Sequence, residues 1–449
     1  MKTLTKILII TSFAFSHNLF AANEKNIVSN YKIEFTKEKE SKNSLHIRCE
    51  FDINIEQLNI DTCIEMKFGG KLKEYTINDS TFSTYPHIDY VYDDEQKTIK
   101  FYPANSKYSH VIMEYDFLSY STLVIYRNVC EIWETSFSEF YYPFIFGEKS
   151  LFDVTVKAPA EYLVIGGYNF TEKEGQPDIK IYHYKTEYPV ASHSCVFAIL
   201  PDSTYTNAKY GLKNFEVETY LLKDVDVPDK RITELLYLTS ASIDFFSKYF
   251  GKYDNKQLGI ENKLTYIFHK NAVSNRNDLN FIIASQYKFA QKPHILPLAH
   301  EIGHRWFGEW TLLIENGESG AYFIKESLNE YLSFIFAKYY YGQDFFDNII
   351  DSCRRQYNTI KNTNRDKSLY DMKFNNNFTV VYNKGPLIIN ETVKLMGEDK
   401  WLLFMKDFYL KYAGKPNLKY EDFIELLKTE DEVSAILLDD LVKKGSIDI

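Results

Sequence analysis

Glycine, proline, long apolar runs and dense blocks of basic residues are all scarce in this chain. Its 449 residues include only 18 Gly and 12 Pro, below the usual joint share of about 12%, which excludes collagen-like and low-complexity classes. No apolar run reaches the 18 residues that a membrane-spanning helix needs. The net charge is −10 and Lys and Arg form no dense stripe, so neither a nucleic-acid partner nor a membrane span is expected.

Cysteine is also scarce, with five residues dispersed along the chain and no C-x-x-C pair. This spacing excludes both a disulfide framework and a zinc ribbon. Cys49 and Cys63 could meet across a hairpin, and buried free thiols are the alternative.

Aromatic residues, in contrast, are plentiful. The chain has 36 Tyr and 34 Phe, which supply enough large side chains for sizeable cores. Apolar residues make up 45% and charged residues 25% of the sequence, as in an average globular protein. The length predicts two or three domains of ordinary size.

The first 22 residues have the order of a secretory signal peptide. Lys2 and Lys6 flank the start of the apolar run Ile7–Phe15, and Ala21 and Ala22 precede a polar stretch. We therefore expect cleavage and export, to the periplasm or outside the cell. An uncleaved anchor and a buried N-terminal strand are the alternatives.

The spacing of the apolar residues divides the rest of the chain near residue 225. Earlier segments such as 45–51 and 151–156 alternate in polarity or are rich in β-branched and aromatic residues, which is typical of short strands. Later apolar residues recur at helical spacing. The predicted fold class is α+β and multidomain, with an antiparallel β saddle or sandwich over 23–224 and a mainly α domain over 225–449.

Within the second part, one helix is expected to begin after Pro228 and to end at Gly251. A short sheet is expected around residues 264–269 and 281–284. Further helical patterns cover residues 296–310, 321–341, 344–360, 385–396, 399–412 and 420–428.

One motif contains residue types typical of a catalytic metal site, the H-E-x-x-H run from His300 to His304. On a helix, histidines four residues apart project from one face, so both rings can hold a single Zn²⁺. Glu301 follows the first histidine and can take a proton from water at the open coordination position. A catalytic zinc also needs a third protein ligand, for which the next helical stretch offers Glu326 and Glu330.

The run H-E-I-G-H-R-W-F-G at residues 300–308 resembles the zinc helix of the aminopeptidase N family of gluzincin metallopeptidases. The resemblance is usable over about 137–449 and is weaker before that. It implies an N-terminal β domain and a thermolysin-like catalytic domain. It also implies that the family's C-terminal helical domain is absent, so that a less covered cleft could admit larger substrates.

The third ligand of that family is a Glu in an N-E-G/S segment with a Tyr five residues later. Glu326 and Ser327, followed by Tyr331, are similar to this pattern. Lys325 stands where the family usually has Asn, and the segment begins a few residues later than usual. The resemblance therefore implies that Glu326, rather than Glu330, completes a site for one Zn²⁺ per chain.

A second shared feature is the Y-x-K-G segment, which is Tyr382-Asn383-Lys384-Gly385 in this chain. In the family, the hydroxyl of this Tyr helps to stabilise the oxyanion of the tetrahedral intermediate. The resemblance implies the same role for Tyr382.

The loop that binds the substrate's amine departs from the family. Family aminopeptidases hold the free α-ammonium group with the Glu of a G-x-M-E-N loop, which by position falls near residues 274–278. Here Asn277 stands close to the Glu position with Arg276 beside it. Asp278 could substitute for the Glu, although the Arg disfavours a nearby cation, so Asn277 and Asp278 are the candidate substrate-binding residues. A second candidate around Glu261 looks more like the motif but comes too early.

Together these features predict an exported zinc metallopeptidase that acts on a peptide or protein substrate. Glu301 would activate the water and Tyr382 would stabilise the oxyanion. Two alternatives stay open. One is an endopeptidase, or another zinc hydrolase, that needs no free N-terminus, and the other is a non-catalytic secreted protein with a structural zinc. The oligomeric state is not predicted.

Overall fold

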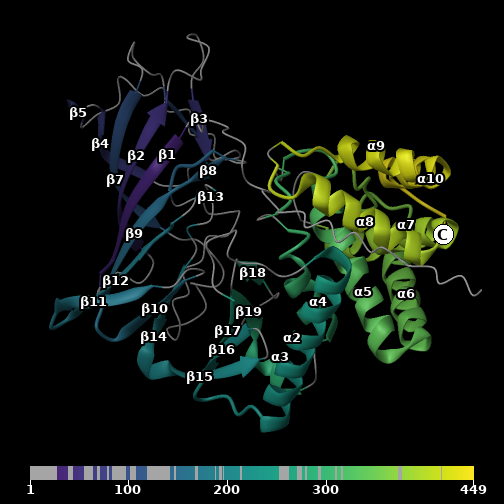
Figure 1. Cartoon of the computed structure of the whole chain (residues 1–449), viewed down its shortest axis with the longest axis horizontal. Coiled ribbons are helices and arrows are strands. Elements are labelled where there is room, and N and C mark those ends of the chain that lie inside the picture. Colours follow the sequence, from purple (N-terminus) through teal and green to yellow (C-terminus); the bar gives the residue numbers. More distant parts are fainter. Residues whose placement is uncertain are drawn as a thin grey trace, which may run out of the picture.

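A computed structural model gives the fold of the chain. It describes residues 28–448 except for 39–43, 55–63, 68–70, 78–79, 83–97, 102–107, 119–141, 146–147, 167–169, 188, 192–194, 196, 213–214, 252–261, 270–275, 279–280, 292–294, 309–310, 315–316, 373–376 and 416. Figure 1 shows a β-rich part formed by the first half of the chain and a helical part formed by the second half.

The β-rich part is built around an eight-stranded sheet with the strand order β11-β12-β9-β1-β2-β7-β4-β5. Its strands in chain order are β1 (Val28–Lys37), β2 (Ser44–Asn54), β4 (Lys71–Ile77), β5 (Ser80–Phe82), β7 (Tyr108–Leu118), β9 (Phe152–Pro159), β11 (Thr171–Gln176) and β12 (Ile179–Lys185). Three two-stranded sheets pair β3 (Ile64–Lys67) with β6 (Thr98–Phe101), β8 (Lys149–Ser150) with β13 (Val190–Ala191), and β10 (Tyr162–Gly166) with β14 (Phe197–Pro201). Buried and less buried residues alternate along β9, as they do in a strand with one face on a core.

The predicted strand-rich first part is confirmed, with one difference in its pairing. The central strands β1 and β9 run parallel, with Ile33 opposite Val154, whereas the sequence predicted an antiparallel arrangement. The two strands lie far apart in the chain, so a long connection replaces the hairpin that joins antiparallel neighbours.

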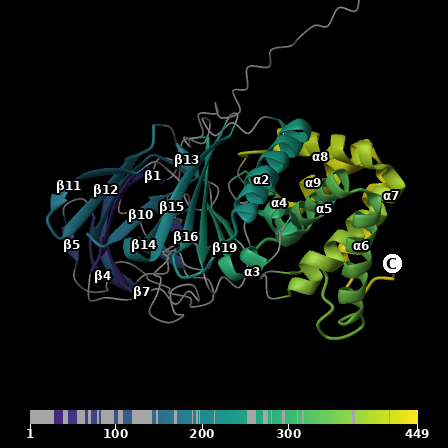
Figure 2. The same ribbon diagram turned by 90° about the horizontal axis from the view of Figure 1, so that it is seen from below.

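A five-stranded sheet lies between the β-rich and helical parts (Figure 2). Its strand order is β15-β16-β17-β19-β18, from β15 (Tyr205–Leu212), β16 (Phe215–Leu222), β17 (Lys263–His269), β18 (Arg276–Asp278) and β19 (Phe281–Ser285). The parallel pair β16–β17 is connected through helix α2 (Asp229–Phe250), the usual crossover between parallel strands. This sheet therefore extends across the predicted domain boundary near residue 225.

The two faces of this sheet contribute to different cores. Ile267 and Ile283 pack into the core of the β-rich part. Tyr266, Phe268 and Ile282 pack into the core of the helical part. Because side chains alternate across a strand, these neighbours in β17 and β19 join the two parts of the molecule through one layer.

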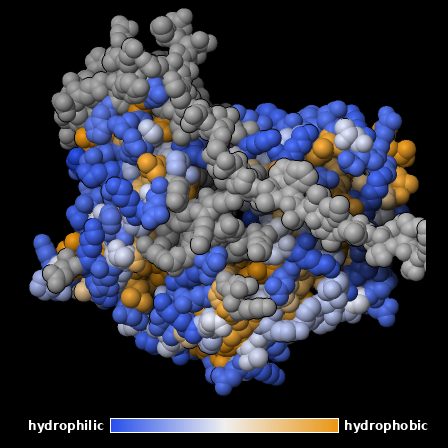
Figure 3. Space-filling model, viewed as in Figure 1, coloured by the Kyte–Doolittle hydropathy of each residue, from blue (hydrophilic) through white to orange (hydrophobic). Residues whose placement is uncertain are grey.

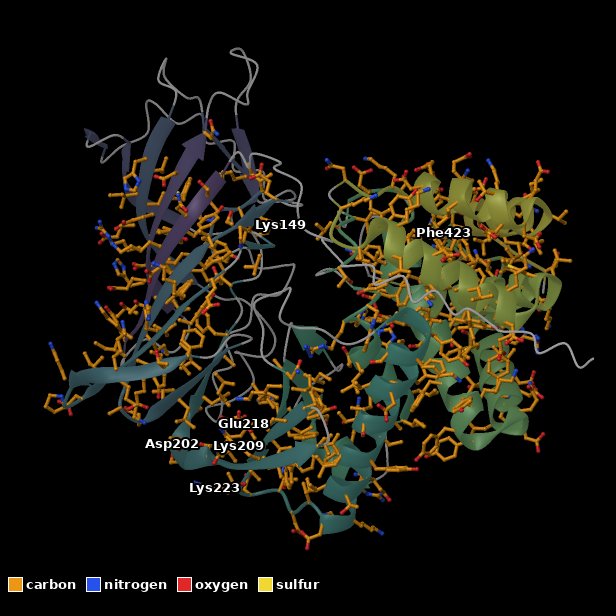
Figure 4. All side chains as sticks on the ribbon, in the orientation of Figure 1. Lys149, Asp202, Lys209, Glu218, Lys223 and Phe423 are labelled. Carbon is orange, nitrogen blue, oxygen red and sulfur yellow. The ribbon has the colours of Figure 1, made fainter. Side chains whose placement is uncertain are left out.

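The second half of the chain is mainly helical, as predicted. Its elements are α3 (Gln286–Gln291), α4 (Ile295–Gly303), the π-helical turn η4 (Phe323–Ser327), α5 (Leu328–Tyr341), α6 (Gln343–Asn358), the π-helical turn η5 (Val380–Lys384), α7 (Gly385–Met396), α8 (Glu398–Tyr412), α9 (Tyr420–Glu430) and α10 (Glu432–Lys443). Phe423 lies inside this helical group (Figure 4), where its ring centroid is 5.0 Å from that of Phe404 and 4.8 Å from that of Phe408. The expected helix over 296–310 is wrong at its end, because α4 stops at Gly303.

Several predictions concern residues outside the described part. The signal-peptide segment 1–22, Cys63 and Glu261 are among them, so those predictions stand as they were made. Cys49 is a buried free thiol. Among the described residues, no helix is both long and apolar enough to cross a bilayer.

Candidate metal centre

Helix α4 carries the motif that the sequence singled out. Ala299 and Ile302 on one side of the helix are fully buried in the helical core. His300 and Glu301 are 6% exposed. The backbone N–H of His304 donates to the carbonyl of His300 across 3.2 Å, so the second histidine lies on the last turn. The spacing of the motif thus brings both rings to one face, with ring centroids 4.5 Å apart.

Two glycines in and after the motif allow close packing. A Cβ on Gly303 would lie 2.1 Å from Oδ1 of Asn329 on α5. A Cβ on Gly308 would lie 2.2 Å from the carbonyl oxygen of His304. The same Asn329 donates through Nδ2 to the carbonyl of His300 at 2.7 Å, so α5 holds α4 at the first histidine. Asn329 could not be identified from the sequence, because an Asn in a helix gives no signal of its partner.

The histidine rings direct their Nε2 atoms toward one oxygen. Oε2 of Glu326 lies 3.3 Å from Nε2 of His300 and 3.6 Å from Nε2 of His304. One potential ligand atom from each of these three residues lies within 4.8 Å of the other two. Two imidazoles and one carboxylate form a donor set that suits Zn²⁺, so the residues present fit a metal ion.

The other ring nitrogens are held by fixed partners. Nδ1 of His304 lies 3.1 Å from the carbonyl oxygen of Phe307, which can only accept, so this nitrogen carries the proton. Nδ1 of His300 lies 2.7 Å from Oε2 of Glu330. Partners of this kind fix the tautomer and the orientation of a ligating histidine. Glu330 therefore lies behind His300, on the side of the ring away from Glu326.

The charges around the histidines favour a cation. Burial alone lowers the pKa of His300, but hydrogen bonds to Glu326 and Glu330 outweigh it and raise that pKa well above its ordinary value. Burial lowers the pKa of His304 to about 4. Burial would raise the pKa of the Glu326 carboxyl, yet the two histidines and the Tyr382 hydroxyl hold it at about 2. His304 is thus neutral and Glu326 ionised near pH 7, which are the forms that bind metal.

Glu326 and Tyr382 both lie on π-helical turns, η4 and η5. Such turns are rare and frequently occur at functional sites. The hydroxyl of Tyr382 donates to Oε2 of Glu326 at 2.9 Å. The turns touch directly, because the Ser327 hydroxyl donates to the carbonyl of Val381 at 2.7 Å and a Cβ on Gly385 would lie 2.2 Å from Ser327 Oγ. The glycine of Y-N-K-G thus permits the approach that places Tyr382 beside Glu326.

Lys384 of the same Y-N-K-G segment makes buried contacts that hold distant segments together. Its side chain is fully buried, and Nζ lies 3.0 Å from Oδ1 of Asp366. It also donates to the carbonyls of Lys367 and Lys444 at 2.9 and 3.0 Å. Lys384 therefore ties η5 to the end of the chain after α10.

The predicted substrate-binding residues lie on a sheet edge. Arg276, Asn277 and Asp278 form β18, the edge strand, and pair with β19 through Asn277 opposite Ile282. Their side chains lie outside the described part of the structure. The structure therefore brings together His300, Glu301, His304, Glu326 and Tyr382. That Asn277 and Asp278 bind the substrate's amine stays a prediction.

The contact between Glu330 and His300 leads to a testable expectation. Glu330→Gln removes the charge behind Nδ1 of His300 and should weaken zinc binding by about 10- to 100-fold without abolishing it. Glu326→Gln is the matched variant and should reduce zinc content far more, because it alters the carboxylate that both Nε2 atoms face. Competition with a chelator of known affinity measures both. A larger loss in Glu330→Gln than in Glu326→Gln would contradict this assignment.

Comparisons with known proteins give one domain match and several similar structures. Residues 254–442 match the Peptidase family M1 domain. No curated protein sequence matches the chain significantly. The M1 zinc metallopeptidase from Deinococcus radiodurans has a similar structure, with a TM-score of 0.67 at 14% identity over 94% of each chain.

A mutant of that enzyme, solved with a Tyr-Ser-Ala substrate, gives a TM-score of 0.67 at 13% identity over 94% of this chain and 95% of that one. These likenesses show a shared two-domain fold, whereas the domain match rests on the sequence itself. Residues 254–442 thus form a Peptidase family M1 domain, and this domain identifies the chain as a hydrolase of the peptidase class.

Proposed function

We propose that this chain is an exported, zinc-dependent metallopeptidase that binds one Zn²⁺ through His300, His304 and Glu326. The observation that carries the proposal is the convergence of both Nε2 atoms on one oxygen of Glu326, with Glu301 next to the first histidine. The similar enzyme from Deinococcus radiodurans, which was solved with a tripeptide substrate, supports a peptide as the substrate class. The signal-like residues 1–22 support export.

A zinc ion held at these residues would act as a Lewis acid and lower the pKa of a bound water. The chain supplies the remaining steps. The Glu301 carboxylate takes a proton from the attacking water, whose oxygen bonds to the scissile carbonyl carbon. When the C–N bond breaks, Glu301 passes that proton to the leaving nitrogen. The second proton of the water leaves the new carboxyl group for the amine product, which gives a carboxylate and an ammonium group.

Tyr382 contributes to the same step by stabilising the carbonyl oxygen. As the carbonyl carbon becomes tetrahedral, its oxygen gains negative charge and needs a preorganised donor. The Tyr382 hydroxyl, now 2.9 Å from Glu326, is placed at the edge of the centre and would turn to donate to that oxygen. We propose aminopeptidase N-like chemistry of this kind, with an amine-binding loop that differs from that of the family.

The requirement for a free N-terminus is tested with one peptide in two forms, one free and one acetylated. The purified zinc-containing protein is incubated with each, and the products are identified by mass spectrometry. Cleavage of the free form alone would mean that Asp278 or Glu261 binds the ammonium group and that the enzyme is an aminopeptidase. Cleavage of both forms would mean that the amine site is lost and that the enzyme acts as an endopeptidase. Failure to cleave either form, with zinc bound at full occupancy, would contradict the proposed function.

A further inference from the structure

Tyr382 and Lys384 lie on one π-helical turn, η5, but face different parts of the molecule. Tyr382 lines a cavity of about 470 Å³ beside the candidate metal centre, together with His300 and Glu301. Lys384 does not line this cavity, and its side chain is fully buried. Since a helical turn takes roughly four residues, two residues that are two apart lie on nearly opposite sides of it. The contacts of Lys384 therefore hold the turn from the side away from the cavity.

The ammonium group of Lys384 is surrounded by oxygen atoms from two other segments of the chain. Its Nζ lies 3.0 Å from Oδ1 of Asp366 and donates to the carbonyl of Lys367 at 2.9 Å. It also donates to the carbonyls of Lys444 and Gly445 in the segment after α10. Four oxygens thus meet the three N–H groups of one buried cation.

Asp366 extends these contacts to helix α6. Its Oδ2 accepts from the hydroxyl of Tyr357 at 2.7 Å, and that hydroxyl accepts from the backbone N–H of Ile447 at 3.0 Å. The Nζ of Lys384 lies 5.7 Å from the centroid of the Tyr357 ring, within the range of a cation–π interaction. The network therefore joins η5 to α6, to the segment around Asp366 and to the segment after α10.

This buried pair differs from the ion pairs on the nearby surface. Hydrophilic residues form much of the surface around α9 and α10 (Figure 3), where Lys443 pairs with Asp439 at 2.8 Å and is 44% exposed. Water screens such pairs, so they fix the backbone weakly. The side chains of Lys384 and Asp366 are 0% and 1% exposed. Water cannot replace either partner there, so loss of one would leave an uncompensated buried charge.

The position of Tyr382 depends on how its backbone is held. Its side chain is half-buried and stacks on Phe378, which is itself 60% exposed. π-Helical turns are rare, and η5 is held by other segments through the Ser327 hydroxyl at Val381 and through Lys384. A donor to an oxyanion has to lie about 2.7–3.1 Å from it. A misplacement of about 1 Å can cost about 10²-fold in rate.

We propose that the buried pair of Lys384 and Asp366 positions η5 so that the Tyr382 hydroxyl meets the oxyanion. The inference rests on the proposed function. Neither residue of the pair lines the cavity, so both act through Tyr382. Loss of the pair should lower kcat by about 10- to 100-fold. KM should change little, because the hydroxyl acts in the transition state rather than in substrate binding.

The test is the double variant Lys384→Met and Asp366→Asn. It removes both charges together, so no unpaired charge is left in the core, and Asn keeps an oxygen for the Tyr357 hydroxyl. Steady-state kinetics of the zinc-containing protein with one peptide should show the lower kcat. In the Tyr382→Phe background the same double change should have little further effect on kcat, because the hydroxyl that the pair positions is already absent. A general loss of structure would instead lower kcat by the same factor in both backgrounds.

Leu427→Ala on α9 is the control for stability. Leu427 is fully buried in the helical core and does not belong to the Lys384 network. Ala should therefore lower the Tm, while kcat is kept at a temperature where the protein is folded. A double variant that loses stability but keeps kcat would overturn the inference, as would equal kcat losses with and without the Tyr382 hydroxyl.

If the double variant fails to fold, Asp366→Asn alone takes its place. It removes one charge and keeps the carbonyl partners of Lys384, so it should lower kcat with little change in KM, although by a smaller factor. An unchanged kcat in this variant would overturn the inference.

If the unmodified protein cleaves no peptide, the proposed function fails separately, and crystal structures still decide the inference. In the double variant, the 2.9 Å contact between the Tyr382 hydroxyl and Glu326 should be lost, or Tyr382 should occupy more than one conformer. Leu427→Ala should keep that contact. An unchanged contact in the double variant would overturn the inference.

Discussion

Replacing Glu301 by Gln should lower peptide hydrolysis by about 10²- to 10⁴-fold, the usual contribution of a general base, while zinc binding is retained. The amide has nearly the shape of the carboxylate but cannot take the proton of the attacking water. Glu301 is 6% exposed and lines the cavity beside the centre, so it meets few bulk waters that could replace it as a base. Turnover measured together with zinc per chain checks both parts of this expectation.

A matched control for Glu301→Gln is Glu391→Gln on α7. Glu391 pairs with Lys394 at the surface, 2.7 Å away, and removal of such an exposed charge changes little. Full turnover in this control would show that loss of a single carboxylate does not reduce activity by itself. Unchanged hydrolysis in Glu301→Gln would contradict the assigned role. A protein with a structural zinc would bind its metal equally well with either residue and hydrolyse no peptide.

The core of the site could be predicted because its geometry is local. His300, Glu301 and His304 lie within about one helical turn, so a single element sets their relative positions. The sequence likewise predicted a short sheet at β17 and β19. The residues of these strands divide between two cores, because side chains alternate across a strand. The close approach of Asn329 on α5 to Gly303, the last residue of α4, was missed because that contact is tertiary.

The remaining features depend on contacts between distant segments. The distinction between Glu326 and Glu330 is one example, since both lie near His300 and differ only in which ring nitrogen they approach. Spacing along a helix gives the face of each residue but not its partner on another helix. The parallel pairing of β1 with β9 and the contact of Ser327 with Gly385 are of the same kind. From the sequence, only the resemblance to a family favoured Glu326 over Glu330 and pointed to Tyr382.

Replacing Tyr382 by Phe should lower kcat by about 10²- to 10³-fold, the range found when one donor to an oxyanion is removed, with a much smaller change in KM. The phenyl ring can still stack on Phe378, whose ring centroid lies 5.9 Å away, so the local packing should survive. Only the hydroxyl is lost. Tyr339→Phe is the control, because Tyr339 is 68% exposed and does not line the cavity.

Zinc affinity distinguishes two roles for this hydroxyl. In the structure it donates to Oε2 of Glu326, so it could act by holding that ligand in place rather than by donating to the substrate. If it only positions Glu326, Tyr382→Phe should lose zinc affinity, and saturating zinc should restore kcat. If it donates to the oxyanion, zinc affinity should change little and excess zinc should not restore turnover. We expect the second result, because His300 and His304 still direct their Nε2 atoms toward Glu326 when the hydroxyl is absent.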